Sequence, residues 1–189
     1  YGLATRATLT PTNQLIPTAA YALFVADSIG QMGEQGFSLA NHWSIVSGED
    51  VTGIDYGLIR IEQQFKRTPA YFVWPMWAKF GNTRLALANA LSPENQLAAY
   101  AGRDEQGQIT LLAVNKTENG IKTDIVIHTD NGPAYISHGD AHTLRSNGLD
   151  DNAPLYNGVS DPSDDLANAQ PLPLLSQNIG GPSLIRSYT

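Results

Sequence analysis

The hydrophobic pattern of this chain changes at Gly81. Before Gly81, apolar residues recur at three- and four-residue spacing over residues 17–35 and again over 68–81, which predicts two helices. After it, short runs of alternating apolar and polar residues are separated by Gly, Asn and Asp, which predicts antiparallel strands. We therefore expect the fold class α/β plus all-β, with the α/β part over residues 1–81 and the all-β part over 82–189.

The α/β part is expected to run helix, strand, helix. Pro17 suits the first turn of the first helix, because its missing N–H has no helical partner there. Residues 37–46 follow as a mainly apolar run, which is typical of a strand buried on both faces of a parallel sheet. After a loop and a short extended piece, Thr68 and Pro69 begin the second helix, and Pro75 inside it predicts a kink or break.

The all-β part is expected to hold short strands at regular spacing, which favours an antiparallel sandwich resembling a jelly roll. Residues 146–182 are acidic and rich in Asn, Asp, Pro and Ser, which indicates a long loop that lies over the sandwich or is partly mobile. The predicted strands are 84–90, 96–102, 108–115, 120–129, 135–137, 142–145 and 183–188.

Composition excludes several classes of partner. The 189 residues carry 18 Asp and Glu against 11 Lys and Arg, and Lys66–Arg67 is the only adjacent basic pair, so no nucleic-acid partner is expected. Cysteine is absent, which excludes disulfides and thiolate metal sites, and no cofactor is expected. No apolar run approaches the roughly 20 residues that span a bilayer, so no membrane partner is expected.

Three short motifs and the final strand carry a resemblance to a known family. The matching residues are Ala19–Asp27 and on through Gly36, Ala40–Ser44, Thr68–Phe72 and Pro182–Ile185. They resemble the C-terminal part of α-L-arabinofuranosidases and related retaining glycoside hydrolases of clan A. The resemblance implies the seventh helix, eighth strand and eighth helix of a (β/α)8 barrel, followed by a β-sandwich, and a secreted or periplasmic location.

The same resemblance implies where the catalytic groups lie. In such barrels the acid follows strand four and the nucleophile ends strand seven, so both are expected upstream of Tyr1. Two barrel units out of eight cannot close a barrel, because their strands would keep open edges. We therefore expect a missing N-terminal barrel portion as partner, from the same precursor or a separate chain, and no activity of this chain alone.

Asn41, His42 and Trp43 are the expected substrate-binding residues. An indole ring stacks on the apolar C–H face of a sugar, and amide or imidazole groups pair with its hydroxyls, which suits a saccharide subsite. The resemblance favours this interpretation more than the residue types do. The alternative is structural, with Trp43 in the core and His42 as a satisfied buried polar group.

Glu49 and Asp50 are the best carboxylates within the chain for catalysis, because they follow the predicted eighth strand on the active-site face of a barrel. An ordinary polar turn is the favoured interpretation, so no catalytic residue is expected in this chain. Retaining glycosidases need two carboxyl groups about 5–5.5 Å apart.

No metal site is expected either. His138, Asp140 and His142 are zinc-type ligands, but their spacing falls in a strand–turn region, which favours a hairpin with exposed histidines. The acidic residues 150–152 and 161–165 lack the spacing of a calcium-binding loop, which favours a solvated loop.

Two other functions stay open beside polysaccharide hydrolysis with retention. One is a non-catalytic carbohydrate-binding or structural β-sandwich module, and the other is a self-contained α/β domain unrelated to barrels. The sequon Asn115–Thr117 is a weak sign of secretion, since such triplets often arise by chance.

Overall fold

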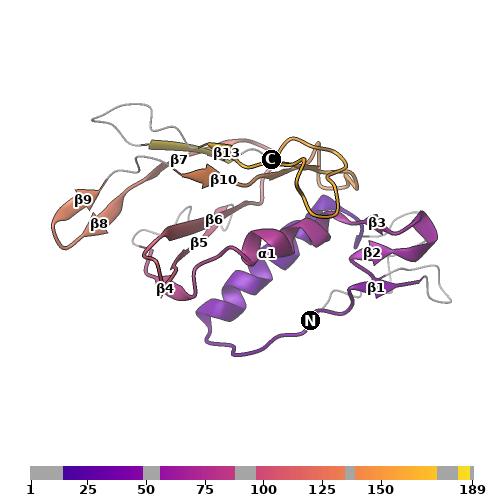
Figure 1. Cartoon of the computed structure of the whole chain (residues 1–189), viewed down its shortest axis with the longest axis horizontal. Coiled ribbons are helices and arrows are strands. Elements are labelled where there is room, and N and C mark those ends of the chain that lie inside the picture. The colour runs from indigo at the N-terminus through magenta and orange to yellow at the C-terminus, as the bar shows by residue number, and fades with distance from the viewer. Residues whose placement is uncertain (1–14, 49–55, 88–96, 135–138, 174–182, 188–189) are drawn as a thin grey trace.

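The computed structural model describes residues 15–48, 56–87, 97–134, 139–173 and 183–187 (Figure 1). Within these residues the fold is mainly β, with two α-helices and several small, largely antiparallel sheets. The helices are α1 (Ala19–Glu34) and α2 (Val73–Trp77), with the 3-10 turns η1 (Ile61–Gln63) and η2 (Pro69–Phe72). The strands are β1 (Val46–Ser47), β2 (Ile59–Arg60), β3 (Lys66–Arg67), β4 (Thr83–Leu85), β5 (Leu97–Arg103), β6 (Ile109–Asn115), β7 (Ile121–Ile125), β8 (Ile127–Thr129), β9 (Gly132–Ala134), β10 (Asp140–Ala141), β11 (Leu144–Arg145), β12 (Leu155–Tyr156), β13 (Leu172–Pro173) and β14 (Ser183–Ser187).

Helix α1 confirms the first helix expected from the sequence. It stops at Glu34, and Gly36 takes a left-handed φ of 77° two residues later, a conformation that glycine adopts without steric cost. The side chain of Thr18 does not cap the helix. Instead, the first two N–H groups donate to backbone carbonyls of a distant segment, at Asp151 and Leu149.

The second predicted helix is shorter than expected and is divided into two elements. Thr68 precedes Pro69, as expected, but the chain first forms the 3-10 turn η2 and then α2. Pro75 occupies the third position of α2, in the first turn, where a missing N–H is tolerated. The kink or break predicted near Trp74 is therefore present as the change from a 3-10 turn to an α-helix.

The antiparallel sheet β4–β5–β6 confirms three predicted strands. Leu97 pairs with Asn115 and Arg103 with Ile109, so β5 and β6 form one long hairpin. The hairpin closes on Asp104, whose carboxylate accepts two backbone N–H groups of the turn. The structure divides the predicted strand 120–129 into β7, which pairs with β14, and β8, which pairs with β9.

One hydrophobic core joins α1 to this sheet (Figure 1). Tyr21 and Val25 of α1 lie in the same buried cluster as Tyr100 of β5 and Leu112 of β6. The Tyr100 hydroxyl donates to the carboxylate of Asp27 at 2.5 Å, which ties the sheet to the helix by a polar contact as well. The core therefore crosses the boundary predicted between residues 81 and 82, and that boundary stays a prediction.

The prediction of a buried strand over residues 37–46 is wrong. Only the last of these residues lies in a strand, as the first residue of β1, which pairs in parallel with β2 and keeps its other edge open within the described residues. In the part of the chain that the structure describes, the large apolar side chains of this stretch lie in solvent. The exposed ones are Phe37 (63%), Leu39 (77%), Trp43 (74%), Ile45 (65%) and Val46 (45%).

The acidic segment, which we define as residues 146–173, is packed rather than free. Its carbonyl groups at Leu149 and Asp151 accept from the start of α1, and Asn157 exchanges hydrogen bonds with the backbone at Thr143. Tyr156 is buried at 1% exposure in a second small core with Phe72. The loop predicted over 146–182 is thus, in its described part, a docked segment with short strands.

Candidate functional site

Exposure alternates along residues 41–43. Asn41 is exposed and Trp43 is 74% exposed, whereas His42 between them is half-buried. Asn41 and Trp43 therefore face solvent, whereas His42 lies partly against the rest of the chain. The peptide bond between Trp43 and Ser44 is cis. Two of the three predicted site residues are therefore exposed, and the third is half-buried.

His42 contacts both α-helices, α1 and α2. Its Nε2 lies 3.1 Å from the hydroxyl of Tyr21 on α1, and its ring meets the Trp74 ring of α2 edge-on at 5.7 Å between centroids. Burial lowers the pKa of His42 below its ordinary value, which favours the neutral imidazole. The structural alternative for His42, a buried polar group with a partner, matches these contacts.

The predicted carboxylates Glu49 and Asp50 lie outside the described residues. A different carboxylate lies at the end of β1: a methyl group added at Gly48 would come within 2.6 Å of Oε1 of Glu62. No spacing rule in the sequence signals this proximity, because η1 carries Glu62 back to the strand through the tertiary fold.

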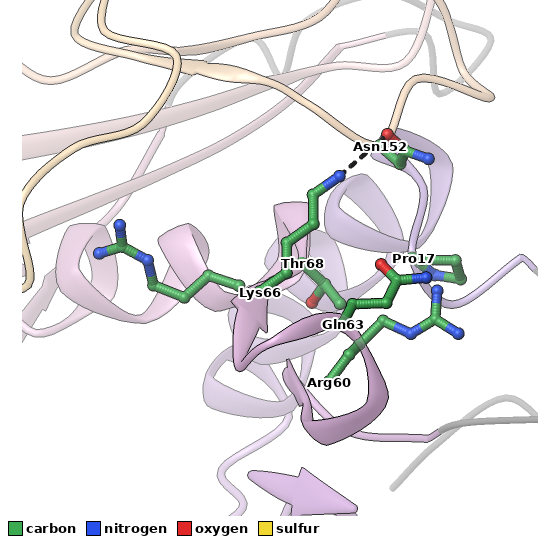
Figure 2. A pocket seen from close by; sticks show the side chains of 7 residues that line it. Pro17, Arg60, Gln63, Lys66, Thr68 and Asn152 are labelled. Atoms are coloured by element: carbon green, nitrogen blue, oxygen red, sulfur yellow. Dashed lines mark hydrogen bonds between the residues drawn. The ribbon is translucent and has the colours of Figure 1, made fainter. Parts of the chain in front are cut away.

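A polar depression lies where the hairpin β2–β3 meets α1 and the acidic segment (Figure 2). Lys66 reaches across it and donates to the side-chain oxygen of Asn152 at 3.4 Å. The hydrogen bond between Lys66 and Asn152 therefore helps to join the hairpin β2–β3 to the acidic segment. The depression is lined by Pro17, Arg60, Gln63, Lys66, Arg67, Thr68 and Asn152.

The His-Gly-Asp-Ala-His motif is only partly described, because His138 lies outside the described residues. Asp140 is exposed, but His142 is half-buried and lies within hydrogen-bonding reach of Tyr156 and Asn157. The prediction of an exposed histidine is therefore wrong at His142, because the acidic segment covers it. No group of three or more His, Asp or Glu residues in the described part of the chain is placed to hold a metal ion.

The carboxylates of Asp151 and Asp165 accept hydrogen bonds from within the acidic segment. Asp151 accepts the N–H groups of Asn147 and Ala153. Asp165 accepts from the backbone of Ala167 and from the Ser163 hydroxyl, and these bonds lower the pKa of Asp165 below its ordinary value. Such side-chain-to-backbone bonds are typical of compact turns.

The sequon is also explained by local structure. Asn115 is 7% exposed, its amide nitrogen donates to the carbonyl of Asn119, and its side-chain oxygen accepts from Thr117. An amide with these bonds is poorly placed for a glycan.

None of the helices in the described residues is both long and apolar enough to cross a bilayer. Compared with known proteins, the chain matches no family model and no curated protein sequence.

Proposed function

We propose that this chain is the C-terminal part of a retaining glycoside hydrolase that acts on polysaccharide. In this proposal residues 1–81 supply the last β/α units of a (β/α)8 barrel, and residues 82–189 form an antiparallel sandwich that supports them. The two catalytic carboxyl groups belong to the barrel portion that precedes Tyr1. The chain itself contributes a saccharide subsite at Asn41 and Trp43.

The observation that carries the proposal is the uncovered apolar run that contains Trp43. Five large apolar side chains between residues 37 and 46 are 45–77% exposed, and the run leads into β1, which is an edge strand among the described residues. Fully burying one such side chain contributes about 1.5–3 kcal/mol, so several exposed apolar side chains within ten residues favour a surface that protein or ligand normally covers. Neighbouring barrel strands would cover most of it.

The proposed subsite follows from the two solvent-facing residues. The exposed indole of Trp43 offers a flat apolar face on which the C–H face of a sugar ring can stack. The amide of Asn41 both donates and accepts, so it can pair with ring hydroxyls. These contacts would orient the sugar, while two carboxylates about 5–5.5 Å apart in the barrel perform nucleophilic attack and acid–base transfer with retention.

A second candidate is a non-catalytic carbohydrate-binding module. The shared core of α1 and the sheet β4–β5–β6 favours it, because these described elements pack against one another. In this case the same Trp43 surface binds saccharide, and no upstream carboxylates are required.

Saccharide binding tests both candidates, and hydrolysis separates them. We would measure the affinity of soluble arabinoxylan for the wild-type chain, for Trp43→Ala and for the control Phe65→Ala, which removes another exposed aromatic (66%). Loss of about tenfold in affinity, or 1.4 kcal/mol, is expected for Trp43→Ala alone. Equal losses in both variants would contradict the subsite.

The complete gene product, with the sequence upstream of Tyr1, is then assayed for hydrolysis by following the anomeric proton of the first product by NMR. The hydrolase proposal predicts initial release of the anomer that has the substrate's configuration. Saccharide binding without any hydrolysis would favour the non-catalytic module instead.

A further inference from the structure

His42 occupies a different environment from the two residues beside it. Asn41 and Trp43 face solvent, whereas His42 is half-buried between helices α1 and α2. Its ring lies 6.1 Å from the ring of Tyr21 and 5.7 Å from the ring of Trp74, measured between centroids. A sugar stacked on Trp43 would therefore meet an exposed indole, whereas the imidazole lies against Tyr21 and Trp74.

The partners of His42 are themselves held in place. Tyr21 is 1% exposed within the main core, and its ring stacks on Phe24 one turn further along α1. Trp74 packs against the same core from α2. The histidine thus ties residues 41–43 to two fixed elements.

The contact between His42 and Tyr21 is directional. A neutral imidazole has one donor nitrogen and one acceptor nitrogen, so Nε2 either accepts the tyrosine O–H or donates to the tyrosine oxygen over the observed 3.1 Å. An apolar side chain of similar volume could fill the space, but it could not fix the orientation of the backbone through a hydrogen bond.

We propose that His42 is a positioning residue, which fixes residues 41–43 so that Asn41 and Trp43 face the saccharide together, and that it does not touch the saccharide itself. This inference rests on the proposed function, and it replaces the expected role of His42 as a substrate contact. The geometry that carries it is the clamp of His42 between Tyr21 and Trp74, with both flanking side chains turned to solvent.

The test observes Trp43 directly. The protein contains three tryptophans, so labelling with 5-fluorotryptophan yields three ¹⁹F resonances, and Trp43→Phe assigns the relevant one. We would compare wild type with His42→Leu, which fills the space without a hydrogen bond, and His42→Gln, which can still bond to Tyr21. Tyr21→Phe removes only the hydroxyl and serves if His42→Leu fails to fold.

The expected result is a shifted or broadened Trp43 resonance in His42→Leu and Tyr21→Phe, with the Trp77 resonance unchanged as a control for folding. Arabinoxylan affinity should fall about tenfold in the same two variants. His42→Gln should restore both the wild-type resonance and most of the affinity, which a role in packing alone would not produce.

Two results would overturn the inference. An unchanged Trp43 resonance in both His42→Leu and Tyr21→Phe would show that the clamp does not position the indole. Loss of affinity in His42→Leu with an unchanged resonance would assign His42 a direct saccharide contact. If the wild-type chain binds no saccharide, the proposed function fails, while the ¹⁹F comparison still decides whether His42 positions Trp43.

Discussion

Replacing Arg67 tests which contacts hold the acidic segment against the hairpin β2–β3. The guanidinium is 13% exposed and donates to the backbone carbonyls of Pro162 and Ser163. It also lies near the exposed carboxylates of Asp161 and Asp164, at 3.3 and 3.7 Å. Arg67 therefore has partly buried carbonyl partners and fully exposed carboxylate partners.

The two kinds of contact should differ in magnitude. Hydrogen bonds from a charged donor contribute about 1.5–3 kcal/mol each, whereas ion pairs with solvent-exposed carboxylates often contribute nothing measurable. The Arg67 guanidinium also lies 5.3 Å from the centre of the Phe72 ring, an attraction of roughly 0.5–1 kcal/mol. Arg67→Lys keeps the charge but loses the planar fork and one carbonyl bond, so we expect a loss of about 2–3 kcal/mol in the free energy of unfolding.

Urea denaturation of three proteins checks this reasoning. Wild type is compared with Arg67→Lys and with the double variant Asp161→Asn, Asp164→Asn, at low and at high salt. We expect a clear loss for Arg67→Lys that salt does not change, and no measurable loss for the double variant. A loss in the double variant as large as that in Arg67→Lys, reduced by salt, would refute the reasoning and assign the role to the ion pairs.

Two further predictions concern the direction in which protein stability changes. Gly30→Ala should destabilise the protein by about 1–3 kcal/mol in urea denaturation, because the new methyl group would meet the Tyr100 ring at 2.3 Å. Gly33→Ala is the control, and it should stabilise the protein by about 1 kcal/mol because the space around Gly33 is open. Stabilisation by both variants would contradict the packing of Tyr100 against Gly30. Burial lowers the pKa of His142 below its ordinary value of 6.5, so the unfolded chain binds the proton more readily and stability is lost as pH falls below that value. The loss between about pH 7.5 and about pH 5.5 should be smaller in His142→Gln than in wild type, and equal losses would exclude His142 as a source.

Elements with strong local signals could be predicted from the sequence. The helix over 17–35 has a spaced apolar face and ends at a glycine, and α1 occupies Ala19–Glu34. The hairpin of β5 and β6 follows from alternation on both sides of an Asp–Glu–Gln–Gly turn. In these cases residues within a few positions of one another determine the backbone conformation.

The candidate site was only partly predictable. The motif at residues 41–43 predicts a site in this stretch, but residue types could not say that His42 faces Tyr21 while Trp43 faces solvent. The approach of Glu62 to Gly48 had no signal at all, since it depends on how η1 folds back.

The sequence by itself determined the change at Gly81 from helical to strand periodicity, because the spacing of apolar residues is a local property of the chain. Only the tertiary structure decided which apolar residues are covered. The run 37–46 has the composition of a buried strand, yet its side chains are exposed, because burial depends on neighbouring elements that local sequence does not specify. The acidic segment shows the reverse: it has the composition of a solvated loop, but its backbone carbonyls satisfy the first N–H groups of α1, a pairing that any residue type can supply.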